Sequence, residues 1–226
     1  MFDINPHITA LQDRISSAVR LVDETHPRPT PNATSIPGPI SREVKGFVLV
    51  LLFGAYENLM SSLTRSLLEE ALKMRVGNRR LRPGFRAFAL VSSAQSIRDL
   101  PGKRLYSHGL PKLVEAADPG GRICTIDPSA FPSDGSFMRI SQIAVWCSLF
   151  DIPNPHLILH RTWALIDAVV AQRNGIAHGR LTPDQVGRDY SEIEIRQLID
   201  DWRDDWTEFL RVVEGRARSR DFYRIP

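Results

Sequence analysis

Cysteine is scarce in this 226-residue chain, which contains only Cys124 and Cys147. Two cysteines exclude a disulfide framework and a paired-cysteine metal site, and they fit reduced thiols in a protein core. The sequence also lacks HExxH, CxxC and a glycine-rich loop before Lys-Ser or Lys-Thr. Because the familiar zinc and nucleotide-binding signatures are missing, we expect no metal and no cofactor.

Long apolar runs are missing as well. The N-terminus has no basic start followed by an apolar run, so we expect no signal peptide. The most apolar stretch, GFVLVLLFGAY at 46–56, is far shorter than the ~20 residues that a membrane span requires, and Lys45 and Glu57 bracket it. We therefore expect a cytoplasmic protein without a membrane segment, in which this stretch forms a helix buried on several faces.

Lysine is rare among the cationic residues, with four lysines against 25 arginines at a net charge of +3. Arginine forms bidentate contacts to phosphate and stacks on bases, so this bias fits a nucleic-acid partner. A GC-rich genome, which favours arginine codons, explains the same bias without any partner. Composition alone therefore does not establish RNA or DNA binding.

Apolar residues recur at helical spacing through most of the chain, which predicts an all-α protein. The helix expected at about 42–75 carries two apolar stripes, so it should be a central helix or a dimerisation helix. A capping box at Ser191 and Glu194 predicts the start of the last helix. The other helices are expected at about 8–24, 85–98, 137–150, 157–173, in a short turn after Thr182-Pro183, and in a final segment reaching Val213.

Residues 99–136 interrupt this pattern, because they are rich in glycine, proline and turn residues. We expect a loop-rich insertion with a short helix at 111–117 and one strand pair near 122–126. No internal repeat is visible, and no clean linker separates two cores. The sequence therefore predicts one domain over 1–226, an up-down helical bundle with its core at about 40–213.

The stretch AQRNGIAHGR, at 171–180, is the strongest candidate for a reactive site. The Arg-x4-His spacing is weak by itself, since 25 arginines and six histidines produce it by chance. On a straight helix Arg173 and His178 would point about 140° apart. We expect Gly175 to permit a bend that Asn174 holds in place, so that both side chains converge. A guanidinium can then bind a phosphate while an imidazole moves a proton.

A second pair, His156 and His160, is four residues apart and could place two metal ligands on one helix face. No carboxylate lies beside the pair, and metal-binding histidines normally have further ligands and supporting contacts. We therefore favour a solvated helix end for these two residues.

The sequence RNGIAH matches the RNxxxH form of the HEPN motif (higher eukaryote and prokaryote nucleotide-binding domain). The surrounding LIDAVVAQRNGIAHGR resembles the bacterial RiboL-PSP-type branch, in which a glycine follows the motif. GAYENLMSSL, at 54–63, also resembles the family, which often has an acidic residue after an aromatic one there. The resemblance covers about 40–213 and does not include the insertion at 99–136 or the N-terminal helix.

This resemblance implies a helical bundle that forms a homodimer with both motifs at the interface, and metal-independent cleavage of RNA. Arg173 would polarise the phosphate, His178 would transfer protons and Asn174 would orient the pair. Glu57 would support them, although a glutamate at such a position is more often a solvated or ion-paired helix residue. Arg180 could bind the RNA backbone, or simply lie at the surface. Some compact toxins of the superfamily have a tyrosine at that position, so its absence argues against their branch.

The implied biological role is phage defence or a toxin-antitoxin-like pair, with an antitoxin or another defence protein as partner. Two other interpretations stay open. The chain could be a non-catalytic HEPN module that binds nucleotide, RNA or a protein. It could also be a purely structural helical domain, in which Arg173 stabilises a helix C-terminus and His178 lies in a turn.

Overall fold

The computed structural model describes residues 2–26, 39–75, 77, 80–117, 126–131 and 138–220, and every regular element in these ranges is helical. This confirms the predicted all-α fold class. The α-helices are α1 (Asn5–Thr25), α2 (Pro39–Lys73), α3 (Pro83–Arg98), α4 (Gly102–Arg104), α5 (Leu110–Ala117), α6 (Ile140–Leu149), α7 (Pro155–Ile158), α8 (Ile166–Ala177), α9 (Pro183–Gly187) and α10 (Glu192–Ser219).

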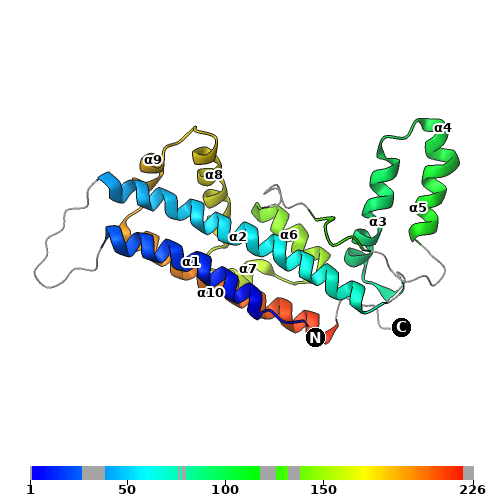
Figure 1. Cartoon of the computed structure of the whole chain (residues 1–226), viewed down its shortest axis with the longest axis horizontal. Helices are drawn as coiled ribbons and strands as arrows, with labels where there is room; N and C mark the ends of the chain where they lie inside the picture. Colours follow the sequence, from blue (N-terminus) through cyan, green and yellow to red (C-terminus); the bar gives the residue numbers. More distant parts are fainter. Residues whose placement is uncertain are drawn as a thin grey trace, which may run out of the picture.

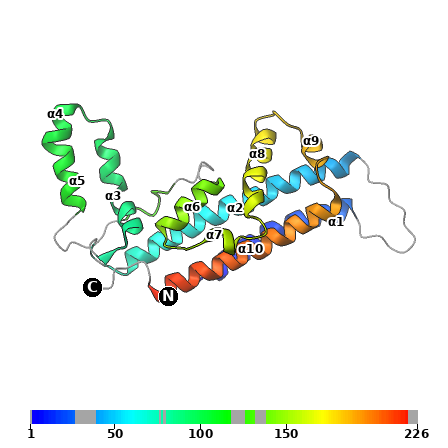
Figure 2. The ribbon, with the colours of Figure 1, turned by 180° about the vertical axis from the view of Figure 1, so that it is seen from behind.

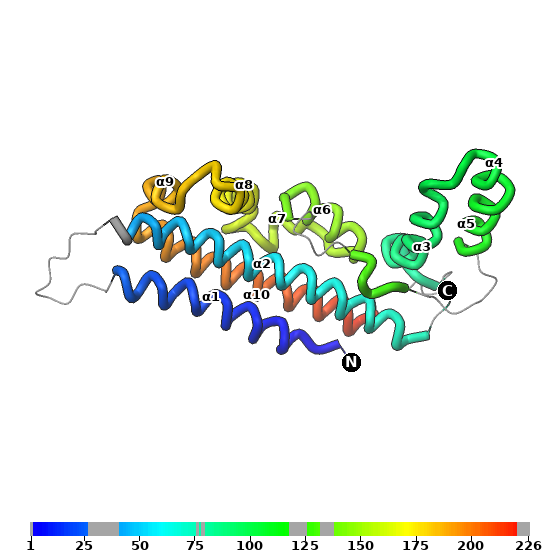
Figure 3. The backbone as a smooth tube through the Cα atoms, turned by 45° about the horizontal axis from the view of Figure 1, so that its top comes forward, coloured from blue at the N-terminus to red at the C-terminus, as the bar shows by residue number. Residues whose placement is uncertain are grey.

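Three long helices form the body of the molecule. α1, α2 and α10 lie side by side along the long axis, and α1 contacts both of the others (Figures 1 and 2). α1 and α2 run in opposite directions, whereas α10 runs in the same direction as α2 (Figure 1). The shorter helices α6, α8 and α9 lie on the side of α2 that faces away from α1 (Figure 3). The predicted helical bundle is therefore confirmed.

α2 is the central helix of the bundle. It contacts α1, α8, α9 and α10, and the residues of both predicted apolar stripes are buried or half-buried. This helix is apolar over a longer range than the stretch at 46–56 suggests. Ser41–Lys73 is long and apolar enough, by length and composition, to cross a membrane, and its most apolar window is 56% buried against the rest of the protein.

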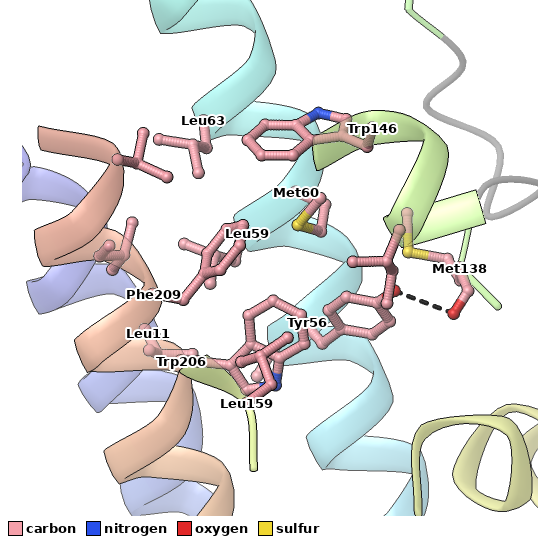
Figure 4. Close-up of a cluster of buried hydrophobic side chains, with 14 of the residues drawn as sticks. Leu11, Tyr56, Leu59, Met60, Leu63, Met138, Trp146, Leu159, Trp206 and Phe209 are labelled. Carbon is pink, nitrogen blue, oxygen red and sulfur yellow. Dashed lines mark hydrogen bonds between the residues drawn. The ribbon is translucent and has the colours of Figure 1, made fainter. Parts of the chain in front are cut away.

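Aromatic residues fill the middle of the core (Figure 4). The Tyr56 ring stacks on Trp206 at a centroid distance of 4.7 Å and meets the edge of Trp202 at 6.0 Å. Its hydroxyl donates a hydrogen bond of 2.9 Å to the carbonyl oxygen of Met138. Burial raises the pKa of Tyr56 well above its ordinary value. This core joins α2 to α10 and to the segment before α6, which fixes the frame on which α8 lies.

The helix predicted at 157–173 is wrong in its boundaries. α7 ends at Ile158, a 3₁₀ turn spans Trp163–Leu165, and α8 begins only at Ile166. The cause is the buried Asp205 on α10. Its carboxylate accepts hydrogen bonds from the backbone amides of Arg161 at 3.0 Å and Thr162 at 2.9 Å, and from the Thr162 hydroxyl. These bonds hold the chain in a turn where local propensity favours a continuous helix.

The insertion is more regular than its composition predicts. α4, a π-helical turn at Leu105–Gly109 and α5 form consecutive helical structure from residue 102 to 117. Pro111 has no amide to donate and its ring would crowd the preceding turn, so the helix widens there. The Leu110 amide accordingly donates to the carbonyl oxygen of Leu105, five residues back.

α9 lies very close to the first half of α2, because two glycines remove the side chains between them. A Cβ atom on Gly46 would lie 2.1 Å from the carbonyl oxygen of Pro183, and one on Gly187 would lie 1.8 Å from that of Arg42. α9 begins at Pro183, as expected after Thr182.

The capping box predicted for the last helix is confirmed. The Ser191 hydroxyl accepts from the amide of Glu194, and the Glu194 carboxylate accepts from the amide of Ser191. The helix then continues to Ser219, beyond the predicted end. The strand pair expected near 122–126 lies outside the described residues, apart from Ile126, which has no regular structure.

Candidate functional site

The motif lies at the C-terminal end of α8. The buried face of this helix, which includes Val169 and Val170, lies against α2. The expected bend at Asn174 and Gly175 is wrong, since α8 continues as a regular helix through both residues to Ala177. Gly175 has a different role. A Cβ atom there would lie 2.6 Å from Cδ1 of Leu181, so the glycine lets Leu181 fold back onto the helix.

The irregular turn comes after the motif, at Gly179. Gly179 has a φ of +67°, in the left-handed region that glycine adopts at low cost. Its amide donates to the carbonyl oxygen of Ile176 at 3.0 Å, and the Arg180 amide donates to that of Gly175 at 2.8 Å. This pair of hydrogen bonds is a Schellman motif, a common way to end a helix. It fixes the backbone of His178 and Arg180.

Arg173 is half-buried and held from two sides. The centre of its guanidinium lies 4.3 Å from the centroid of the Phe53 ring on α2, as a cation–π contact. Its Nη1 atom donates a hydrogen bond of 2.9 Å to Oδ1 of Asn174. Phe53 thus sets the plane of the guanidinium and Asn174 restrains its edge. Arginine has five N–H donors, so this hydrogen bond leaves others to contact a ligand.

His178 is the C-terminal cap residue of α8 and its side chain is exposed. Its backbone amide donates to the carbonyl oxygen of Asn174 at 3.1 Å. Within the described part of the chain, no hydrogen bond joins the imidazole to Arg173. The guanidinium lies against α2 whereas the imidazole faces solvent. One copy of the chain therefore does not join the two side chains by a hydrogen bond, and it places them in different surroundings.

The other two candidate residues flank this site. Glu57 is half-buried on α2, one helical turn after Phe53, and so lies on the same face as the ring that carries Arg173. Across the described ranges, Glu57 and Arg173 form no ion pair within 4.0 Å. Arg180 is exposed and follows directly on the turn that ends α8.

Sequence reasoning missed Phe53, which is the direct support of Arg173. Nothing distinguishes this phenylalanine from its neighbours in the apolar run at 46–56. It also missed two hydrogen bonds that fix α8. The Asp167 carboxylate accepts from the amide of Ile140 at the start of α6, at 2.8 Å, and Tyr190 donates to Gln172, also at 2.8 Å.

The metal-ligand alternative gains no support from the geometry. His156 lies on α7, but His160 lies in the turn after it, where its Nδ1 atom is 3.9 Å from the Asp205 carboxylate. In the ranges that the structure describes, no group of three or more His, Cys, Asp or Glu side chains could hold a metal ion.

A groove of about 690 Å³ lies along α10 and is separate from the motif. Its lining includes Arg161, Arg203 and Arg211, together with the acids Asp204 and Glu208. These charges largely pair with one another, as Arg203 does with Asp204 and Arg211 with Glu208.

Comparisons of the chain with protein-family models, with curated proteins and with solved structures each found no match.

Proposed function

We propose that this protein is a metal-independent endoribonuclease of the HEPN type. The observation that carries the proposal is the end of α8, where an arginine held on an aromatic ring is followed, five residues later, by an exposed histidine. Asn174, which restrains Arg173, and Arg180, which extends the cationic surface beyond His178, support the same assignment. Glu57 is a supporting residue rather than one that touches the RNA.

The chemistry requires three events at one phosphate. The 2′-oxygen of the RNA attacks the adjacent phosphorus, and the bond from phosphorus to the 5′-oxygen of the next nucleotide breaks. Two protons move, because the 2′-hydroxyl loses one and the departing 5′-oxygen gains one. His178 transfers one of them, and the other is exchanged with solvent water. Arg173 stabilises the negative charge that develops on the phosphate. Because the RNA supplies the nucleophile, the reaction needs no metal-activated water.

A second copy of the chain would complete the site. One chain keeps Arg173 on Phe53 and His178 in solvent, so each α8 end offers two parts that do not meet. We propose that two α8 ends face each other around one phosphate in a homodimer. Such an isologous contact places the same surface of both chains at the interface.

The test is cleavage of end-labelled single-stranded RNA in the presence of EDTA. Wild-type protein should leave a 2′,3′-cyclic phosphate, and His178→Ala should reduce the rate by at least about 100-fold, the usual contribution of a proton-transfer group. Arg173→Lys should also be impaired, because lysine lacks the planar fork and the stack on Phe53. His156→Ala is the matched control, since His156 is another exposed histidine. Equal rates for wild type and His178→Ala would refute the catalytic assignment.

The same assay tests the dimer. Arg173→Ala and His178→Ala proteins, each inactive alone, are mixed under conditions that allow subunits to exchange. If Arg173 of one chain acts with His178 of the other, a mixed dimer keeps one of its two Arg173–His178 pairs intact and activity returns. If both residues act from one chain, the mixture stays inactive. A protein that sediments as a monomer at micromolar concentration would contradict the two-chain site.

A non-catalytic module that binds RNA or nucleotide is the second candidate. The separation of Arg173 and His178 within one chain favours it, because the restrained guanidinium can bind a phosphate without help from His178. Binding of RNA without any product would support this candidate. A purely structural α8 end, fully explained by the Schellman motif, would give neither binding nor cleavage.

The proposed biological setting is phage defence or a toxin-antitoxin-like pair, with an antitoxin or defence protein as partner. The proposed cytoplasmic location suits cellular RNA as the substrate. Growth arrest on expression of the wild-type chain, and not of His178→Ala, would support this setting.

A further inference from the structure

Residues 82–117, here called the arm, project from one end of the bundle (Figures 1 and 3). Only the base of the arm is packed into the body. Phe85 and Phe88 lie against Phe150, with ring centroids 5.1 and 5.4 Å away. Between residues 90 and 117 only Gly109 is buried. The outer part of the arm therefore presents most of its surface to solvent.

This outer part carries several exposed cationic residues. Arg98, Lys103, Arg104 and Lys112 are all exposed, and none forms an ion pair with a residue in the described ranges. The arginines of α10 behave differently, since residues such as Arg196 pair with neighbouring acids. Four exposed cations against the two acids Asp99 and Glu115 give the outer arm a net positive charge, which attracts a polyanion.

An exposed aromatic ring belongs to the same segment of the chain. Tyr106 is 73% exposed and belongs to the π-helical turn, between Arg104 and His108. The wider turn leaves residues 103, 104, 106, 107 and 108 all exposed. Single π-helical turns within helices occur frequently at functional sites. A solvated tyrosine flanked by cations is the pattern with which proteins bind single strands, where bases stack on rings and phosphates meet cations.

We propose that the outer arm binds single-stranded RNA, with Arg98, Lys103, Arg104 and Lys112 contacting phosphates and Tyr106 stacking on a base. The preference for single strands follows from Tyr106, because a stacking ring needs an unpaired base. The preference over a membrane follows from the exposed side chains, because Tyr106 and Val114 are the only large apolar residues exposed within 90–117. This inference rests on the proposed function only for the choice of RNA, and it assigns the capture of substrate to a region outside the α8 site.

The experiment measures fluorescence anisotropy of a labelled single-stranded RNA of about 15 nucleotides. All proteins carry His178→Ala, so that cleavage does not alter the probe. Lys103→Gln with Arg104→Gln should weaken binding at least about 10-fold. It should also reduce the slope of log Kd against log salt by about 1.4, since each phosphate contact on a single strand contributes about 0.7. Arg211→Gln with Arg218→Gln removes the same charge from α10, where both arginines are paired, and should change Kd less than about two-fold.

Tyr106 separates stacking from charge. Tyr106→Ala should weaken binding at least about five-fold with an unchanged salt slope, whereas Tyr106→Phe should bind like the parent protein. Absence of RNA binding, or equal losses from the arm and α10 double variants, would overturn the proposal. So would arm variants that lose binding to phosphatidylserine vesicles and keep RNA binding. The binding assay does not depend on cleavage. If the arm binds RNA as proposed but the wild-type protein cuts no RNA, only the nuclease assignment is refuted.

Discussion

The body and the arm of this protein use the same residue types in opposite ways. In the body, Tyr56 and Trp206 are fully buried, and the arginines of α10 pair with acids on their own or neighbouring helices. In the arm, Tyr106 is exposed and Arg104 has no acidic partner among the described residues. Rings packed in a core and arginines paired with acids stabilise a fold. Exposed rings and arginines without such contacts are available to a partner.

The comparison also separates stability from surface chemistry. Burial of apolar side chains, aromatic rings among them, supplies most of the favourable free energy in a core of this kind. The outer arm buries almost no side chain, so substitutions there can change binding with little effect on folding. Three variants or pairs of variants test this division of roles.

The largest effect is expected for Trp206→Ala. Its ring is fully buried and stacks on Tyr56, so truncation should lower the free energy of unfolding by about 3–5 kcal/mol. Tyr106→Ala in the arm should change it by no more than about 0.5 kcal/mol. Urea denaturation followed by tryptophan fluorescence measures both. Comparable losses for the two variants would mean that the arm is part of the cooperative core.

An intermediate effect should locate the boundary between arm and body. A Cβ atom on Gly84, at the base of the arm, would lie 2.0 Å from the carbonyl oxygen of Leu149 on α6. Gly84→Ala should therefore lower the free energy of unfolding by about 1–3 kcal/mol. Gly102→Ala, where no atom lies within 4 Å, should leave it unchanged or raise it by up to about 1 kcal/mol. Thermal melts of the two proteins distinguish these outcomes. If Gly84→Ala leaves the stability unchanged, the boundary between arm and body lies closer to Phe85.

The smallest effect is a dependence of stability on pH in the body. Burial lowers the pKa of His7 below its ordinary value of 6.5, an effect that Asp3 partly offsets. The unfolded chain therefore binds this proton more readily, so the free energy of unfolding is highest above pH 6.5 and falls as the pH drops. His7→Gln should flatten that fall, and burial of His26 should leave a residual slope. The exposed His108 of the arm is the control, and His108→Gln should retain the wild-type profile across denaturation curves at pH 5–8.

Much of the body could be predicted from sequence, because a long helix that is buried on one face has apolar residues at regular helical spacing. The two stripes on α2 and the capping box at Ser191 and Glu194 are local patterns, and both are confirmed. The break between α7 and α8 could not be predicted. It depends on Asp205, which lies more than 40 residues along the chain and looks like any other acid on α10.

The candidate site shows the same limit. The sequence identifies Arg173, Asn174 and His178 as residues of interest, but it assigns the wrong glycine to the turn. The sequence does not distinguish Gly175 from Gly179. Only the fold shows that Gly179 has the left-handed backbone while Gly175 accommodates Leu181. The contact of Arg173 with Phe53 joins two helices, so no local pattern contains it. The short helix predicted at 111–117 is confirmed as α5, but proline and glycine in the insertion likewise conceal the helical structure at 102–109.

The close approach of α9 to α2 has a consequence for regulation. Gly46 and Gly187 leave no room between the two backbones, and Asp167 holds the other side of the same segment to α6. The end of α8 is thus held to the body before and after the motif, which restricts any hinge within one chain that could carry His178 to Arg173. Under the proposed function, the encounter of two chains takes the place of that hinge. Activity would then depend on the number of molecules in the cell, with abundance itself acting as the signal.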